Sequence, residues 1–296
     1  MDVNDVSIDL GGFVISGPFS CPGNPASCVA AGLGYAIDAN TVAGTSVANG
    51  SVRGTARGIS IGDHCAVHDV RVVETTNQGI FAGTGCSLSR IVAARNGSDG
   101  IQVGQGSITD SAAHDNEGAG FRFGSNGTIT GSSARRNGTS GISGNAGTSV
   151  SDCVASDNLG SGVSLNAGSV VTSSASYSNT GTGITLGAGG VITDSSSYNN
   201  GGAGISAAVS TSVSNSSVSF NSDRGIVLGA GSQVIGNSIR GNTGLGLQFG
   251  DGSGYRENVL TGNNGGLEAQ VAASVPATDT IFNLGSNVCG TDTICP

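Results

Sequence analysis

Three side chains near the middle of the sequence combine the groups needed to remove a proton and to expel a leaving oxygen. They are His114, Arg135 and Tyr177, and successive members lie 21 and 42 residues apart. A histidine can accept the proton, an arginine can neutralise a neighbouring carboxylate, and a tyrosine can donate a proton or stack on a ring. If the fold brings them to one face, these residue types predict β-elimination next to a carboxylate, with His114 as the base.

Other polar and aromatic side chains recur at related spacings and are candidates for binding a substrate. They are Arg95, Asp115, Arg136, Asp157 and Tyr198. Asp115 and Asp157 suggest a hard cation such as Ca²⁺, but carboxylates two strand spacings apart, about 10 Å, cannot share one ion. The sequence therefore predicts no metal site and no cofactor, with calcium as the alternative. A simpler interpretation is a solvated face on which arginines and aspartates alternate.

These spacings follow from an internal repeat that runs through most of the chain. A glycine followed by an apolar residue recurs at steps of 20 or 21 residues. The apolar anchors are Ile59, Ile80, Ile101, Phe121, Ile142, Val163, Ile184, Ile205, Ile226, Leu247 and Leu267. Further apolar or small residues follow each anchor, as Val150 and Ala155 follow Ile142. Three inward positions per period predict three short strands in each turn of a coil.

Asparagine fills one further position of the repeat. The column consists of Asn96, Asn116, Asn137, Asn158, Asn179, Asn200, Asn221, Asn242 and Asn263. Asparagine tolerates left-handed backbone and can hydrogen-bond to its copy one period away, so the column predicts a stacked ladder at a turn. The glycine-rich stretch before each anchor, such as residues 157–162, is expected to supply positive φ angles at a second corner.

The fold predicted from this repeat is all-β, a single-stranded right-handed parallel β-helix. We expect a solenoid of about 13 coils of about 21 residues, because each coil buries its inward face only against its neighbours. One domain is expected over residues 1–296. Within it, residues 1–57 form degenerate N-terminal coils, residues 58–267 form regular coils, and residues 268–296 form a C-terminal cap.

The seven cysteines indicate an oxidising compartment. Cys21 and Cys28 close a short loop, as do Cys289 and Cys295, and both spacings suit a disulfide better than a zinc site. Cys65 and Cys86 occupy equivalent positions in adjacent coils, where they can form a disulfide or stack as thiols.

Composition excludes several classes of protein. The net charge is −9, and the 11 basic residues are all arginines, which argues against a nucleic-acid partner. No run of 18 apolar residues is present, so no transmembrane segment is predicted. The start, Met1-Asp2-Val3, has no basic segment followed by an apolar run, so secretion must be inferred from other features.

The opening VSIDLGGFVISG (residues 6–17), the repeated N-x-x-x-G-[IVFL] coils and the closing Asn287-Val288-Cys289 resemble a known family. They are similar to secreted bacterial right-handed parallel β-helix repeat proteins of the pectate-lyase-like superfamily. The resemblance covers essentially the whole chain and implies a secreted or cell-surface location. Members that act on sugars do so along an outward strand face. Known catalytic motifs are missing, since there is no Lys for Arg-x-Lys and no Asp-Pro-His.

The predicted function is therefore a carbohydrate-associated β-helix that binds polysaccharide along its outward strand face. The first alternative is a polysaccharide lyase that cleaves a uronic-acid polymer by β-elimination and uses His114, Arg135 and Tyr177. The second alternative is a structural or adhesin stalk without catalysis. The oligomeric state is not predicted.

Overall fold

The computed structural model describes residues 4–18, 34–266, 270–275 and 278–290. This part of the chain contains no α-helix, and its parallel strands stack as a solenoid of about 11 turns. It falls into two compact units: unit 1 contains residues 1–149 and 153–159, and unit 2 contains residues 150–152 and 160–296. The predicted all-β parallel β-helix is confirmed. The domain boundaries expected from the sequence stay a prediction.

The number of turns is somewhat lower than the 13 expected. At the N-terminal end, only β1 (Ser7–Asp9) and β2 (Val14–Ser16) precede β3 among the described residues, and both pair with β4. A complete turn needs three strands, and these two do not form one. The degenerate N-terminal stretch therefore adds fewer turns than the sequence suggested.

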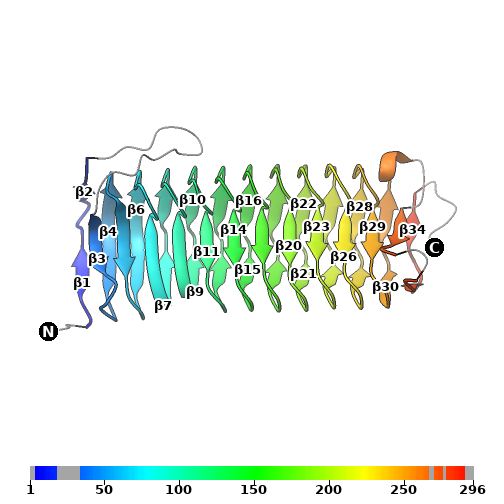
Figure 1. Ribbon diagram of the computed structural model, residues 1–296, viewed down its shortest axis with the longest axis horizontal. Helices are drawn as coiled ribbons and strands as arrows, with labels where there is room; N and C mark the ends of the chain where they lie inside the picture. The colour runs from blue at the N-terminus through cyan, green and yellow to red at the C-terminus, as the bar shows by residue number, and fades with distance from the viewer. Residues whose placement is uncertain (1–3, 19–33, 267–269, 276–277, 291–296) are drawn as a thin grey trace. The chain divides into compact units, whose positions relative to one another are not determined.

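Each turn in unit 1 contributes a first, a second and a third strand, and each kind pairs with its own kind to form one parallel sheet (Figure 1). The first-strand sheet contains β3 (Tyr35–Ala39), β5 (Arg57–Ile61), the beginnings of β7 (Ile80–Ser89) and β9 (Ile101–Thr109), β11 (Phe121–Phe123) and β14 (Ile142–Gly144). The second-strand sheet contains the beginnings of β4 (Ser46–Arg53) and β6 (Ala66–Val73), the ends of β7 and β9, and β12 (Thr128–Thr130). The third-strand sheet contains the ends of β4 and β6, β8 (Val92–Ala94), β10 (Ala112–His114), β13 (Ser133–Arg135) and β16 (Val154–Ser156).

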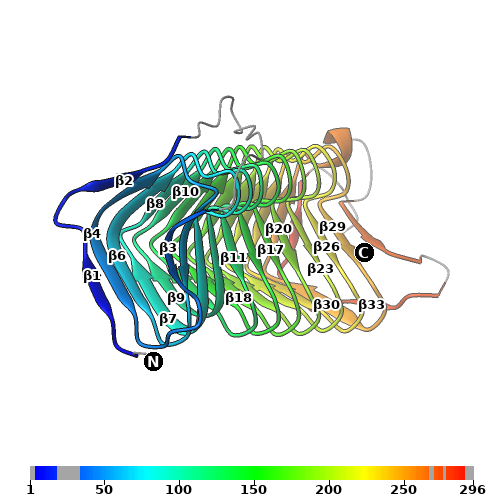
Figure 2. The ribbon, with the colours of Figure 1, turned by 60° about the vertical axis from the view of Figure 1, so that its left-hand side comes forward.

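Unit 2 repeats the same three-strand turn, and Figure 2 shows its first strands β20, β23 and β26 side by side. Its first strands are β17 (Val163–Leu165), β20 (Ile184–Leu186), β23 (Ile205–Ala207), β26 (Ile226–Leu228), β29 (Leu247–Phe249) and β32 (Val271–Ala273). Its second strands are β18 (Val170–Thr172), β21 (Val191–Thr193), β24 (Ser212–Ser214), β27 (Gln233–Ile235), β30 (Ser253–Arg256) and β33 (Ile281–Asn283). Its third strands are β19 (Ala175–Tyr177), β22 (Ser196–Tyr198), β25 (Ser217–Ser219), β28 (Ser238–Arg240), β31 (Val259–Thr261) and β34 (Val288–Cys289). A short 3₁₀ helix spans Asn264–Gly266, and β15 (Ser149–Ser151) falls on the boundary between the units.

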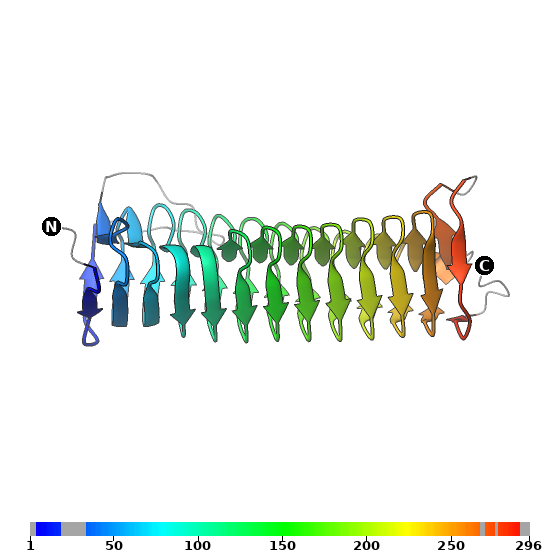
Figure 3. The ribbon, with the colours of Figure 1, turned by 90° about the horizontal axis from the view of Figure 1, so that it is seen from below.

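The register between turns explains why the apolar anchors recur every 20 or 21 residues. In unit 1, Ile80 pairs with Ile101, and in unit 2 Ile184 pairs with Ile205. All four side chains are buried. The strands of each row point the same way (Figure 3). Because alternate strand residues face opposite sides, the residue after each anchor points outward, and each sheet presents an outward column of side chains.

The predicted asparagine ladder is present within each unit. In unit 1 the Asn116 amide donates to Asn137 Oδ1 at 3.0 Å, and in unit 2 the Asn200 amide donates to Asn221 Oδ1 at 3.0 Å. The expectation that the asparagines hold the left-handed backbone is wrong. The residue immediately before each one does so, as in Asp115 with φ 59°. The asparagine side chain must point inward to reach its copy, which leaves the preceding residue to make the reversal.

The glycines before the anchors from Ile59 to Leu247 do not have positive φ, contrary to expectation, and are needed for space instead. A Cβ atom on Gly100 would lie 2.7 Å from Asn116 Nδ2 and 2.8 Å from the Gly120 carbonyl oxygen, which belong to the next turn. Positive-φ glycines lie instead at other corners, such as Gly168 with φ 66° between a first and a second strand. The close approach of successive turns therefore requires glycine at the end of each asparagine loop.

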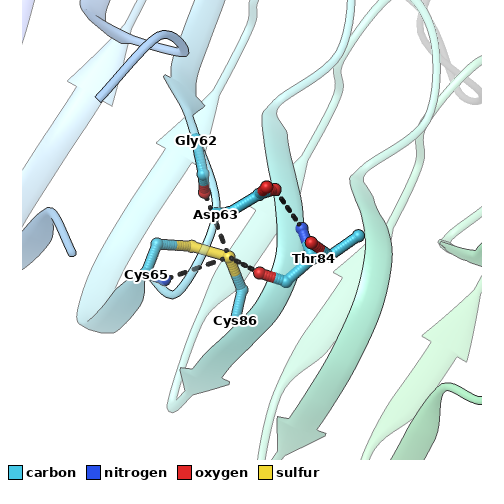
Figure 4. The surroundings of a disulfide bond; sticks show 5 residues. All are labelled: Gly62, Asp63, Cys65, Thr84 and Cys86. Carbon is cyan, nitrogen blue, oxygen red and sulfur yellow. Dashed lines mark hydrogen bonds between the residues drawn. A yellow bond between two sulfur atoms is a disulfide. The ribbon is translucent and has the colours of Figure 1, made fainter. Parts of the chain in front are cut away.

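Cys65 and Cys86 form a disulfide between adjacent turns of unit 1, which resolves the alternative left open by the sequence (Figure 4). Their Cα atoms lie 4.4 Å apart, and both residues are buried. Beside them, Asp63 Oδ1 accepts a hydrogen bond from the Thr84 amide at 2.7 Å. Cys289 is also disulfide-bonded. Its predicted partner Cys295, together with the predicted pair Cys21 and Cys28, lies outside the described residues.

Candidate functional site

The third-strand sheet of unit 1 places His114 within a cluster of three charged or titratable side chains. His114 ends β10, Asp115 forms the left-handed turn after it, and Arg136 occupies the same turn position 21 residues later. His114 Nδ1 lies 2.7 Å from Asp115 Oδ2. The Arg136 guanidinium donates to both carboxylate oxygens of Asp115, at 2.7 and 2.8 Å. We call these three residues the inner His–Asp–Arg cluster.

Asp115 and Arg136 each stabilise the charged form of the other. Burial alone would raise the pKa of Asp115, but the hydrogen bonds from Arg136 and His114 outweigh it and lower the pKa below its ordinary value. The hydrogen bond to Asp115 raises the pKa of Arg136, and the charge of Asp157 adds to this effect. Asp115 is thus ionised at neutral pH and accepts hydrogen bonds from both neighbours.

An ionised Asp115 determines which ring nitrogen of His114 carries the proton. A carboxylate only accepts, so Nδ1 donates to it, and in the neutral ring Nε2 keeps a lone pair. The half-buried imidazole is therefore oriented as a hydrogen-bond acceptor or a base at Nε2. The sequence predicted that His114 acts as a base, and that role stays a prediction.

Arg135 lies beside His114 in the strand register and contributes a different kind of charge. It pairs with His114 on one side and with Ser156 on the other. Its side chain is exposed and makes no ion pair with any residue that the structure describes. Of the two adjacent arginines among the predicted site residues, Arg136 is already bound to Asp115, whereas Arg135 is available to an anion.

The remaining predicted residues of unit 1 surround this cluster without joining it. Arg95 donates to Glu74 Oε1 at 2.6 Å in a separate ion pair. Asp157 lies exposed at the turn position that follows Arg136. Within the described ranges, no group of three or more His, Cys, Asp or Glu side chains is arranged to hold a metal ion. The expectations about calcium and cofactors stay predictions.

Tyr177 and Tyr198 lie in unit 2, on β19 and β22. They pair in register, and their rings stack with centroids 4.8 Å apart and planes 10° from parallel. Burial raises the pKa of Tyr198 above its ordinary value. The two rings form one aromatic surface that the sequence predicted from their shared position in the repeat.

A second His–Asp–Arg cluster, which the sequence analysis missed, lies in unit 1 at the turn after the second strand. His68 Nδ1 lies 2.8 Å from Asp69 Oδ2, and Arg90 donates to both oxygens of Asp69, at 2.6 and 2.7 Å. We call these residues the outer His–Asp–Arg cluster. The detectable signal is a His-Asp pair followed by Arg 21 residues after the Asp, which occurs at both places.

Comparison with known proteins agrees with this architecture. A family model described as "Right handed beta helix region" matches residues 57–191. The A-module of the mannuronan C-5 epimerase AlgE6 from Azotobacter vinelandii aligns with a TM-score of 0.66 over 98% of this chain and 91% of that chain, at 14% identity. The fold is that of a right-handed parallel β-helix.

Two further solved structures are similar to this β-helix. The A-module of the mannuronan C-5 epimerase AlgE4, also from Azotobacter vinelandii, has a TM-score of 0.60 and 14% identity, over 96% of this chain and 86% of that chain. The periplasmic alginate epimerase AlgG has a TM-score of 0.61 and 12% identity, over 84% of this chain and 75% of that chain. At this level of identity the likeness is one of fold. No curated protein matches the sequence.

No helix in the described ranges is both long and apolar enough to cross a membrane.

Proposed function

We propose that this β-helix binds an acidic polysaccharide along the third-strand sheet of unit 1, centred on Arg135 and His114. The observation that carries the proposal is the exposed guanidinium of Arg135, which has no ion pair among the described residues and lies in register with His114. Strands in a parallel sheet repeat at about 4.8 Å, close to the length of one sugar unit. The three similar structures named above are mannuronan and alginate epimerases, which supports a uronic-acid polymer as ligand.

The other residues assigned to the site have secondary parts in this proposal. Arg95, Arg136 and Asp157 border the binding face, and the first two are held in place by ion pairs with Glu74 and Asp115. Tyr177 and Tyr198 give unit 2 an aromatic contact surface for sugar rings. The Cys65–Cys86 disulfide is consistent with an extracellular or periplasmic location, because such compartments preserve disulfides.

A binding experiment tests this proposal. Calorimetric titration with hexamannuronate, and with fragments of pectate and hyaluronan, measures the affinity of the wild type and of Arg135→Ala. We expect Arg135→Ala to weaken binding about tenfold, because it removes the exposed cation that lies in register with His114 and has no ion pair among the described residues. Arg71→Ala is the matched control, since Arg71 is also exposed in the third-strand sheet and its loss changes the net charge equally. Equal effects of both variants would show that only net charge matters, and absence of binding would favour the stalk.

A lyase is the second candidate, favoured by the orientation of the His114 ring. In this reaction Nε2 takes the C5 proton, the released electron pair forms the C4–C5 double bond, and the C4–O bond breaks. The departing oxygen then takes a proton; the sequence assigned this role to Tyr177, which belongs to unit 2 and not to the cluster of unit 1, and the role stays a prediction. Absorbance of the unsaturated product measures the reaction. His114→Ala should abolish it and His68→Ala should not, while Tyr177→Phe tests the proton donor separately. No product from any uronate polymer would leave a binding protein.

A further inference from the structure

A groove with a volume of about 240 Å³ lies on the first-strand sheet of unit 1, a different sheet from the one that carries His114 and Arg135. Its floor is an outward column in which Phe81, Gln102, Arg122 and Ser143 pair in successive strands β7, β9, β11 and β14. Asn145 lines one side. The volume is below the roughly 300–1,000 Å³ of pockets for drug-sized ligands, so it suits about one ring-sized group.

The aromatic side of this groove is open to a ligand. Phe81 is 37% exposed although it is a large apolar side chain, and no side chain in the described ranges stacks on its ring. A pyranose has a face of C–H bonds that packs against such a ring and an edge of hydroxyls that needs polar partners. Gln102, Ser143 and Asn145 supply amide and hydroxyl partners around Phe81.

The cation of the groove is already neutralised. Arg122 donates through Nε and Nη2 to the two carboxylate oxygens of Asp99, at 2.5 and 3.1 Å. Asp99 is buried and also accepts from the Ala119 amide at 2.7 Å, so it cannot leave this pair at low cost. The remaining N–H groups of Arg122 can donate to a hydroxyl, but the pair as a whole offers little attraction to a carboxylate.

We propose that this groove is a second carbohydrate site, which binds one neutral hexopyranose unit of an oligosaccharide with its ring on Phe81 and its hydroxyls on Gln102 and Arg122. The site is independent of the proposed binding of acidic polysaccharide: it lies on another sheet, and its arginine is paired with Asp99, whereas Arg135 has no ion pair among the described residues. Neutral sugar chains and uronate chains would thus engage different faces of unit 1.

Titration of the full chain with cellohexaose, mannohexaose and maltohexaose, followed by NMR, tests the site. At least one of the three should bind saturably, and Phe81→Ala should weaken that binding about tenfold because the stacking surface is lost. Phe81→Tyr should retain it. Thr185→Ala is the matched control, because Thr185 occupies the same outward column position in unit 2. Thermal melts verify that the variants fold. Gln102→Ala is a second variant of the groove, chosen because the side chain of Gln102 is partly exposed.

Three results would overturn the proposal. They are absence of saturable binding by all three neutral oligosaccharides, binding that Phe81→Ala and Gln102→Ala leave unchanged, and a preference of this groove for hexamannuronate. Arg135→Ala distinguishes the two sites, since it should weaken the binding of hexamannuronate and leave the binding of the neutral oligosaccharide unchanged.

Discussion

The inner and outer His–Asp–Arg clusters of unit 1 share one geometry but differ in their surroundings. In both, an aspartate in a left-handed turn holds the preceding histidine and is held by an arginine one turn later. The side chain of Asp115 is 9% exposed, whereas that of Asp69 is 39% exposed. His114 pairs in register with Arg135, whereas His68 pairs with Ser89. The shared geometry therefore stabilises a corner of the coil, and the neighbouring Arg135 is the reason why the inner cluster, and not the outer one, is proposed as a binding site.

The largest expected difference between the clusters is in stability. Asp115→Ala removes the carboxylate that accepts hydrogen bonds from Arg136 and from the half-buried His114, and we expect it to lower the free energy of unfolding by about 1–3 kcal/mol. Asp69→Ala should change it little, because water replaces the lost partner of exposed side chains. Urea unfolding of both variants measures the difference. Similar midpoints would mean that burial does not separate the two corners.

A smaller effect is expected on how the free energy of unfolding depends on pH, and its direction follows from the pKa of Asp115. The folded state lowers the pKa of Asp115, so this group stabilises the fold above its unfolded pKa of about 3.9 and loses that contribution as the pH falls through its lower folded value. The stability gap between wild type and Asp115→Asn should therefore be constant near neutrality and shrink below about pH 4. Chemical unfolding at a series of pH values measures it. A gap that does not change with pH would contradict an ionised Asp115.

The smallest expected effect comes from converting the outer cluster toward the inner one. Ser89→Arg places an exposed cation in register with His68, as Arg135 is with His114. We expect an increase of about twofold in affinity for hexamannuronate, as is typical of a single exposed charge contact. Calorimetric titration measures the gain, and Ser89→Gln is the uncharged control. A decrease would show that the outer corner is unsuited to an acidic chain.

The repeat made most of the fold predictable. Predictions from it were wrong or incomplete where they depended on backbone angles or side-chain rotamers. A regular step fixes which residues become neighbours, so the Asn116–Asn137 contact and the pairing of Tyr177 with Tyr198 followed directly. It does not fix which residue of a corner is left-handed, and that residue proved to be the one before each asparagine. Proximity alone also left the state of Cys65 and Cys86 open, since both alternatives place them at the same positions.

The candidate site was predictable in its members but not in their connections. His114, Arg135 and Arg136 were found from shared columns, yet only the structure shows that Arg136 is bound to Asp115, while Arg135 has no such pair among the described residues. The groove at Phe81 was missed because its column changes residue type at every turn, from phenyl to amide to guanidinium. A search for one repeated residue type does not detect a surface made of different ones.

The close fit at Gly100 and along the asparagine ladder has a consequence for how such a chain can change in length. Inserting or deleting a whole 21-residue period within a unit restores every inward contact, because each turn meets an equivalent neighbour. A shift by a single residue reverses inward and outward side chains along the affected strands and sets a Cβ against a carbonyl oxygen. Duplication of complete periods is thus the tolerated way for the chain to lengthen. Each added period contributes new outward-facing side chains, which can form a different ligand contact.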